Sequence, residues 1–327
     1  MTEIQPTAAL DLLVVGDCNP DVLVLGDDVS PEFGQQEKLV DSISLVAGGS
    51  AAITAIAAAR LGLRVALAAV VGADFAGEFM LGLLTAEGVD TASIRVRPGV
   101  ATGMTVALSH GSDRAILTAT GTMTSLTACD IPPDLVRRAR HLHVSSYFLL
   151  EQSLGPGLAR LFAQAQAGGT ATSLDTNWDP AGRWGGDQLR SALAHTDLLL
   201  PNETEALLLS GEPTLRAAIP VLTAMGAKVV VKLGASGALC ADRTEIHRIE
   251  QPARRPDAVV DTTGAGDCFN AGLIAGLLRG LDLPAAAGLG CEAGSASTRA
   301  AGGTSAAPTL SAALALADAV TIRPGWD

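Results

Sequence analysis

Residues 50–71 read SAAITAIAAARLGLRVALAAVV, and this stretch decides the class of fold. Its first part, residues 50–61, has the alanine-rich apolar pattern of a helix and is closed by Gly62. Its second part, residues 64–71, is a continuous apolar run of strand length. A strand that is apolar on both faces and follows a helix predicts a parallel sheet covered by helices on both sides.

The same alternation continues along the chain. Further short apolar runs occur at residues 12–16, 141–146, 170–174, 198–200 and 228–233. We expect each of these runs to be a strand followed by a turn and a helix. The pattern predicts a doubly wound, mostly parallel α/β sheet, in which ligands bind at the carboxyl ends of the strands.

Two regions interrupt this alternation, at about residues 22–46 and 94–118. Both contain short segments of alternating polarity without good helices, which predicts antiparallel strands. Because one region lies on each side of the helix at residues 50–61, the two could meet as a small β lid inserted into a single domain of residues 1–327. A small sheet with an apolar face also predicts a homodimer formed through the lid.

Composition excludes several classes of protein. The 327 residues carry a formal net charge of −12, which argues against binding nucleic acid because such proteins cluster Lys and Arg. The five cysteines form no CxxC pair, so neither a disulfide framework nor a zinc site is indicated. No basic leader precedes an apolar run, and no apolar stretch is long enough to cross a bilayer. We therefore expect a soluble, cytoplasmic protein with no membrane partner.

One motif carries the chemistry, Asp261-Thr-Thr-Gly-Ala-Gly-Asp267. Glycines before a helix let backbone N–H groups converge on one point at the positive end of that helix, which suits an anion or a transferring phosphoryl group. Asp267 stands where a carboxylate can take the proton of an attacking hydroxyl. The alternative is a plain glycine-rich helix start in which Asp267 only balances the helix dipole. Neither a Walker P-loop nor a GxGxxG fingerprint is present.

Taken with three other motifs, this segment resembles the ribokinase-like (PfkB) carbohydrate kinase family over nearly the whole chain. Residues 47–62, AGGSAAITAIAAARLG, are similar to the amino-terminal signature of the family, and Asp261 to Asp267 to its carboxy-terminal signature. Between them, residues 201–205, PNETE, are similar to its NxxE motif, and residues 232–237, KLGASG, to its nucleotide-contacting strand end. The resemblance implies ATP and Mg²⁺ as cofactors.

The resemblance also implies roles for residues near the phosphates. Asp267 would be the general base, and the amides of Gly264, Ala265 and Gly266 would hold the transferring phosphate. The implied nucleotide contacts, besides Gly266, are Asn202, Glu205, Lys232, Gly234 and Gly237. Of these, Glu205 would hold Mg²⁺ through water, since Mg²⁺ keeps part of its hydration. An ordinary helix N-cap is the alternative for residues 202–205.

On the acceptor side, the implied contacts are Asn19, Asp21, Gly48, Gly49, Ile53 and Asp267. Ser50 and Ile53 stand where ribokinases carry a lysine and an asparagine, which favours a less polar face of the ligand. In the segment from Leu174 to Pro180, which resembles the DxN motif of several sugar kinases, Asp175 and Asn177 could line the nucleotide side. Asp179 there replaces a common arginine, which disfavours a phosphorylated or acidic sugar.

A monovalent cation, K⁺ in this family, is a further expectation from the resemblance. The matching elements are Asp261, Thr263 and Gly302 in the loops beside the glycine motif. The alternative is that Asp261 only caps local backbone.

The leading hypothesis is ATP-dependent phosphoryl transfer to a hydroxyl of a neutral sugar or sugar-like molecule. A nucleoside kinase of the same fold is the first alternative, and a catalytically idle sugar- or nucleotide-binding regulator is the second. The base Asp267 disfavours the regulator, which would not need it. A Rossmann dehydrogenase is disfavoured because its fingerprint is missing after the first strand.

Overall fold

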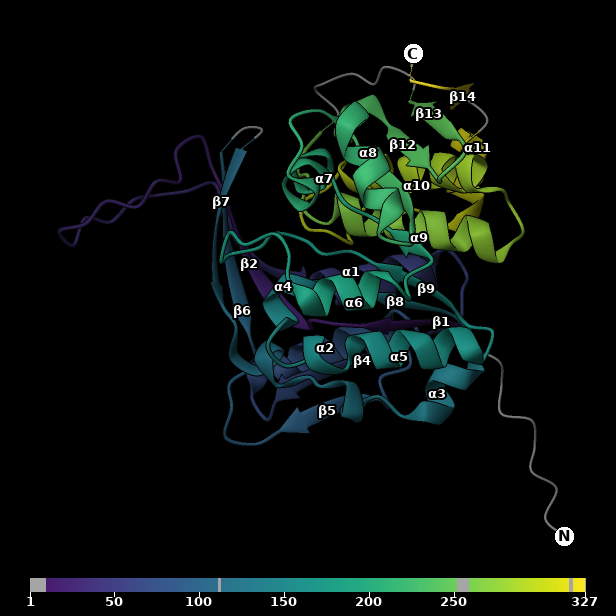
Figure 1. The fold of residues 1–327 in the computed structure, drawn as a ribbon. Helices are drawn as coiled ribbons and strands as arrows, with labels where there is room; N and C mark the ends of the chain where they lie inside the picture. The colour runs from purple at the N-terminus through teal and green to yellow at the C-terminus, as the bar shows by residue number, and fades with distance from the viewer. Residues whose placement is uncertain (1–9, 111–112, 252–258, 318–319, 327) are drawn as a thin grey trace, which may run out of the picture.

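The computed structural model describes residues 10–110, 113–251, 259–317 and 320–326 (Figure 1). Its main feature is a large sheet in the order β14-β13-β12-β11-β10-β9-β8-β1-β4-β5. The bounds of these strands are β1 Leu10–Val15, β4 Val65–Gly72, β5 Ile94–Arg97, β8 Ala139–Val144, β9 Ala171–Leu174, β10 Leu198–Leu199, β11 Lys228–Lys232, β12 Ala238–Ala241, β13 Ile246–Glu250 and β14 Thr321–Pro324. The strands from β5 across to β11 pair in parallel, and β12, β13 and β14 continue the sheet in antiparallel pairings.

Helices cover both faces of this sheet. One layer contains α3 Pro133–Arg138, α4 Tyr147–Leu150, α5 Gly155–Ala167, α6 Asp187–Leu193, α7 Glu203–Ser210 and α8 Leu215–Ala224. The other contains α1 Ser50–Arg60, α2 Phe75–Ala86, α9 Ala265–Leu278, α10 Leu283–Ser297 and α11 Leu310–Ala317. Short 3₁₀ turns occur at η1 Gly121–Ser125, η2 Ala128–Asp130 and η3 Gly234–Ser236.

Strand β1 shows why the sheet needs two helical layers. Its Leu13 and Val15 side chains enter the core under the first layer, whereas Leu12 and Val14 enter the core under the second. Since successive side chains of a strand point to opposite faces, a continuous apolar run must be buried on both sides. The predicted mostly parallel, doubly wound α/β class is confirmed.

A second, smaller sheet stands beside the main body, in the order β3-β2-β6-β7 (Figure 1). Its strands are β2 Asn19–Leu25, β3 Ser42–Gly48, β6 Met104–His110 and β7 Asp113–Ala119. The outer pairings β2–β3 and β6–β7 are antiparallel, and the central pairing β2–β6 is parallel. The two interrupting regions therefore do meet in space, and the small β sheet is confirmed.

Three details of the predicted organisation are wrong. Strand β5, within residues 94–118, pairs with β4 in the large sheet and not with the small sheet. Strand β1 is followed by β2, and β11 by the 3₁₀ turn η3 and then β12, so neither is followed by an α-helix. An apolar run predicts that its own side chains are buried. It does not predict whether the next element is a helix or a strand.

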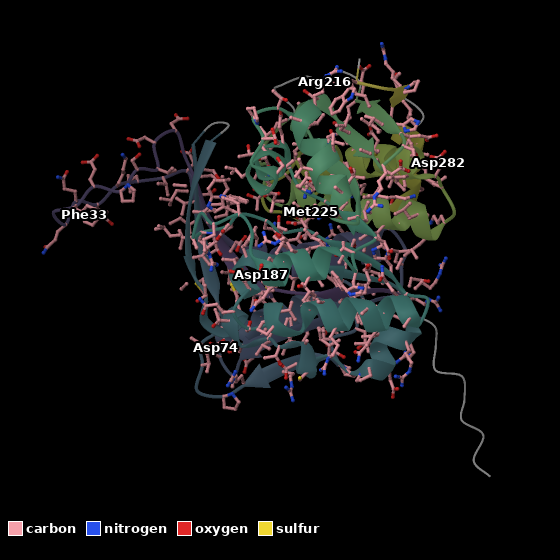
Figure 2. The ribbon with its side chains drawn as sticks, viewed as in Figure 1. Phe33, Asp74, Asp187, Arg216, Met225 and Asp282 are labelled. Atoms are coloured by element: carbon pink, nitrogen blue, oxygen red, sulfur yellow. The ribbon has the colours of Figure 1, made fainter. Side chains whose placement is uncertain are left out.

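Residues 26–41 leave the small sheet between β2 and β3 as an extended arm (Figure 1). Phe33 at its tip is 98% exposed (Figure 2), and Lys38 pairs with Asp28 and Glu32 within the arm. Across the described residues, no helix combines the length and the apolar character needed to span a membrane.

Candidate active site

The predicted base lies in the first turn of α9, at the carboxyl edge of the large sheet. Gly264 precedes the helix with φ of 70°, a conformation that favours glycine, and a Cβ there would meet the Gly303 Cα at 2.6 Å. The Ala265 N–H donates to the Thr262 carbonyl at 3.2 Å, which closes the turn. Asp267 is 7% exposed because α9 packs against α1 and α10. The glycine motif thus delivers a carboxylate and the amides of a helix start to one buried point.

The electrostatics of Asp267 differ from those of an ordinary surface carboxylate. Its pKa is raised to about 8, first by burial and then by the negative charges of Asp175 and Asp17. The ammonium of Lys232 and a hydrogen bond from Ser50 act in the opposite direction. A carboxyl group with such a pKa is suited to exchange a proton near neutral pH.

Lys232 ends β11 and brings a positive charge to the same place. Its Nζ lies 2.5 Å from Asp175 Oδ2, and 3.6 Å from where a Cβ on Gly266 would stand. The same Asp175 oxygen accepts a hydrogen bond from Asn270 Nδ2 at 2.6 Å. Burial acts to lower the pKa of Lys232, but the carboxylates of Asp175 and Glu205 outweigh it and raise that pKa. A charged ammonium is therefore held beside the glycine motif.

Asn202 and Glu205 form a capping box at the start of α7. Asn202 Oδ1 accepts the Glu205 N–H at 2.9 Å, and Glu205 Oε2 accepts the Asn202 N–H at 2.9 Å. The backbone of Asn202 also forms an isolated parallel β-bridge with that of Lys232, so Asn202 and Glu205 lie beside Lys232. Burial raises the pKa of Glu205 to about 7, with a further contribution from Asp175. The N-cap that was the simpler interpretation is present, and it leaves one Glu205 oxygen for another partner.

Gly234 and Gly237 shape the turn between β11 and β12, with φ of 56° and 92°. At Gly237, a Cβ would collide with the backbone carbonyl of Ile249 on β13. Both glycines therefore have a structural reason to be there, and they lie directly after Lys232.

On the acceptor side, Asn19 and Asp21 lie on β2, opposite Gly48 and Val46 of β3. Asn19 Nδ2 donates to Asp21 Oδ1 at 3.0 Å, while Asn19 Oδ1 is buried with no hydrogen-bond partner. The Asp21 carboxylate fills the space where a Cβ of Gly48 would stand. Gly49 has φ of 77°, and a Cβ there would lie 2.8 Å from Asn19 Oδ1. The two glycines make room for polar side chains of the neighbouring strand.

Ile53 is placed apart from these polar groups. It is 3% exposed on α1, and its side chain packs against Gly264 and Gly303. The structure thus brings Ile53 against the glycine motif.

The residues expected for a monovalent cation come together. Asp261 Oδ1 accepts from the Thr263 N–H at 3.0 Å and from its hydroxyl at 2.8 Å, and Asp261 Oδ2 accepts from the Gly302 N–H at 2.8 Å. Asp261 therefore joins two loops by capping their backbone. Within the described residues, no group of three or more His, Cys, Asp or Glu side chains is arranged to hold a metal ion.

Two further residues of the site were not predicted from the sequence. Asp17, directly after the glycine that follows β1, accepts the N–H groups of Ser50 and Ala51 at 3.2 and 3.0 Å. Asn270, one turn after Asp267, joins α9 to Asp175. The position of Asp17 after a strand end was a signal for it, whereas Asn270 looks like any polar residue in a helix.

Asn177 and Asp179 lie in the loop after β9. Asn177 adopts φ of 54° and donates from Nδ2 to Ser50 Oγ at 3.0 Å. Asp179 is 1% exposed and accepts the N–H groups of Ala181, Arg183 and Trp184 at 2.7–2.9 Å. Asp179 therefore folds its own loop.

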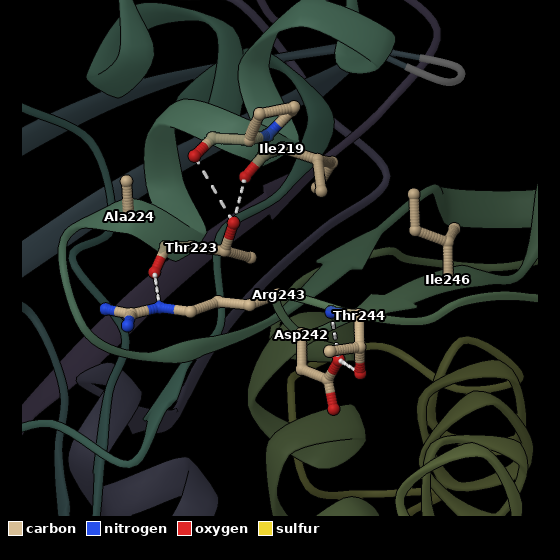
Figure 3. A pocket seen from close by; sticks show the side chains of 8 residues that line it. Ile219, Thr223, Ala224, Asp242, Arg243, Thr244 and Ile246 are labelled. Carbon is tan, nitrogen blue, oxygen red and sulfur yellow. Dashed lines mark hydrogen bonds between the residues drawn. The ribbon is translucent and has the colours of Figure 1, made fainter.

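A separate surface hollow lies between α8 and the turn from β12 to β13 (Figure 3). Its lining includes Thr223, Asp242 and Arg243, and none of the expected site residues. Because Val229 pairs with Ala241, this turn lies near the start of β11, at the opposite end from Lys232. The hollow is thus remote from Asp267.

Comparisons with known proteins place the chain in one family. Residues 9–310 match the model of a family described as pfkB family carbohydrate kinase. The chain is 30% identical to the ribokinase of Haemophilus influenzae over 270 residues, which cover 80% of this chain and 84% of that protein. It is 26% identical to the cytidine kinase of Thermococcus kodakarensis over 284 residues, 86% of this chain and 94% of that protein.

Among solved structures, an Escherichia coli protein named as a ribokinase II, in complex with ATP and Mg²⁺, superposes with a TM-score of 0.81. The two sequences are 25% identical, and the match covers 94% of this chain and 99% of the other.

Proposed function

Because this chain belongs to the pfkB family of carbohydrate kinases, we propose that it transfers a phosphoryl group from ATP to a hydroxyl of a neutral sugar or sugar-like molecule. The observation that carries the proposal is the convergence of Asp267, the helix start at Gly264 to Gly266, and the Lys232 ammonium. A base, a set of backbone donors and a cation are the groups that phosphoryl transfer needs at one point.

Each group has a defined task in this reaction. Asp267 accepts the proton of the acceptor hydroxyl as the hydroxyl oxygen forms its bond to phosphorus. The amides of Gly264, Ala265 and Gly266 stabilise the charge on the transferring group, with Ala265 releasing its bond to Thr262. Lys232 neutralises charge on the nucleotide side, and the bond from that phosphorus to the departing diphosphate oxygen breaks.

The nucleotide lies along the ends of β10 and β11 in this proposal. Asn202, Gly234 and Gly237 line it, and Glu205 binds Mg²⁺ through water. Glu205 fits such an ion, since its capping bond to the Asn202 N–H uses Oε2 and leaves Oε1 for a hydrated cation. The ion supplies charge neutralisation on the phosphates. The E. coli protein of the same fold, solved with ATP and Mg²⁺, supports this assignment.

The acceptor lies against β2 and β3. Asn19 Oδ1 and the Asp21 carboxylate accept hydrogen bonds from its hydroxyls, over the backbone of Gly48 and Gly49. Ile53 supports this region from behind by packing on Gly264. In the described residues, Lys232 is the cation that lowers the pKa of Asp267, and it is already paired with Asp175, which favours a neutral acceptor.

Two further assignments accompany the proposal. Carbonyl groups of the loops tied together by Asp261, Thr263 and Gly302 bind K⁺ beside the helix start. The exposed Ile43 and Leu117, which the strand register places on the same face of the small sheet, cover those of a second copy and form a homodimer. Sedimentation of the protein as a monomer at micromolar concentration would contradict the dimer.

The test of the function is ADP release from Mg-ATP with a panel of pentoses, hexoses, ketoses and nucleosides. We expect at least one neutral sugar to raise ADP release well above the rate with ATP alone. Stimulation by nucleosides only would favour a nucleoside kinase, an alternative supported by the similarity to the cytidine kinase. If no acceptor stimulates release while ATP still binds, the protein is a binding regulator and the proposal is wrong.

A further inference from the structure

The start of helix α1 is filled by a carboxylate from this chain. Asp17 Oδ2 accepts the Ser50 N–H at 3.2 Å and Asp17 Oδ1 accepts the Ala51 N–H at 3.0 Å. These are the first N–H groups of an 11-residue helix, and they have no acceptor within the helix. Such a helix start would otherwise be a favourable place for an anionic group of a ligand.

Asp17 is also an unbalanced charge. It is 4% exposed, and burial raises its pKa, against the hydrogen bonds from Ala51, Ser146 and Ser50. Among the ion pairs of the described residues, none involves Asp17. Its negative charge therefore acts on its surroundings without a cation to screen it.

Those surroundings are the reacting centre. The Ser50 N–H donates to Asp17, while the Ser50 hydroxyl bonds to Asp267, so one residue separates the two carboxylates. The charge of Asp17 contributes to the raised pKa of Asp267. The Asp17 carbonyl oxygen also lies 3.0 Å from where a Cβ of Gly49 would stand, next to the unpartnered Asn19 Oδ1. Asp17 thus lies behind the acceptor groups of β2 and β3.

We infer that Asp17 is a specificity-determining residue, which excludes acidic and phosphorylated acceptors by occupying the helix start of α1 with a fixed negative charge. The inference rests on the proposed kinase function. Asn19 Oδ1 and the Asp21 carboxylate, which this proposal places against the acceptor, accept hydrogen bonds, so the site recognises hydroxyl donors. Like-charge contacts cost more binding energy than a missing contact, and this makes the exclusion effective.

The experiment compares Asp17→Asn and Asp17→Ser with the wild-type protein. Both substitutions remove the charge and keep a residue that caps helices well, and Ser also leaves space for an anion. Matched acceptor pairs are glucose with glucuronate and fructose with fructose 6-phosphate. We expect the preference for the neutral member, measured as the ratio of kcat/KM values, to fall by about tenfold or more in both variants.

A second readout needs no kinase activity. The rise in Tm caused by sodium sulfate, relative to sodium chloride at equal ionic strength, should be larger in Asp17→Ser than in the wild type. Asp74→Asn is the matched control. Asp74 (Figure 2) is a carboxylate that caps α2 after β4 by accepting the Gly77 N–H at 2.9 Å, and its other side-chain hydrogen bonds are to Thr102.

The outcomes separate this inference from the proposed function. Unchanged preference and an unchanged sulfate effect in both Asp17 variants would overturn the inference and leave the kinase function intact. If no acceptor is turned over, the sulfate readout still decides the role of Asp17 at the helix start. If neither variant folds, the wild-type protein provides the test. The inference is overturned if the wild type binds glucuronate, as an acceptor or as a competitor, as tightly as it binds glucose.

Discussion

Lys232 and Asp175 are 57 positions apart in the sequence, yet Lys232 Nζ lies 2.5 Å from Asp175 Oδ2 at the ends of β11 and β9. The pair is buried, with side-chain exposures of 12% and 1%. Asp175 raises the pKa of Asp267 while Lys232 lowers it, so the ion pair adjusts the base as well as holding the cation in place.

Replacing Asp175 by Asn should therefore change the pH dependence of the reaction. In the wild type, kcat/KM should rise with pH and level off above about pH 8, because only ionised Asp267 accepts a proton. Asp175→Asn removes a negative charge and leaves Lys232 unpaired, and both effects lower the pKa of Asp267. The acid limb of the profile should shift to lower pH. Asp187→Asn, at an exposed position on α6 (Figure 2), should leave the limb in place. A shift to higher pH would contradict this account.

Replacing Asp267 itself by Asn should abolish most of the turnover. The amide cannot accept the proton of the acceptor, so kcat should fall by at least about 10²-fold, the usual contribution of a general base. Binding of ATP, measured by calorimetry, should persist because Lys232 and the helix amides remain. Turnover close to that of the wild type would rule out Asp267 as the base.

The same substitution should stabilise the protein at high pH. The folded-state pKa of Asp267 is raised from 3.8 to about 8, so the folded state holds its proton over this range while the unfolded chain has released it. Stability from this group is fully present below about pH 4 and is lost as pH rises through about 8. The Asp267→Asn variant does not lose this stability at high pH, because an amide does not ionise. Urea unfolding at pH 5 and pH 8.5 should show the variant gaining in relative stability at the higher pH. An equal difference at both pH values would contradict the raised pKa.

Gly48→Ala should damage the acceptor side selectively. A methyl group at Gly48 would overlap the carboxylate of Asp21, which must then leave its place beside Asn19. We expect the KM for the acceptor to rise at least about tenfold, as when one partner of a buried hydrogen bond is lost, with the KM for ATP nearly unchanged. Gly82→Ala is the control, since a Cβ on Gly82 of α2 meets nothing within 4 Å. That change should stabilise α2 by up to about 1 kcal/mol. Equal effects of Gly48→Ala on both KM values would indicate general misfolding.

The amino-acid sequence by itself determined the class of fold and predicted where the chemistry takes place. Runs such as residues 12–16 and 65–71 are apolar on both faces, and only a sheet between two helical layers buries such strands. Gly264 and Gly266 predict an anion-binding turn at the start of α9, because the positive φ that Gly264 permits is a local property of the chain. The small β sheet was also foreseeable from its alternating segments.

Only the tertiary structure decided which groups meet there. Asn270 reaches Asp175 across 95 positions, and Asp17 reaches Ala51 across 34, so no local pattern could reveal either bond. Ile53 is predicted from the sequence as a ligand contact, and only the structure shows that it packs on Gly264, because the rotation of α1 about its axis depends on its neighbours. The pKa of Asp267 is likewise a property of burial and of distant charges, which exist only once the chain has folded.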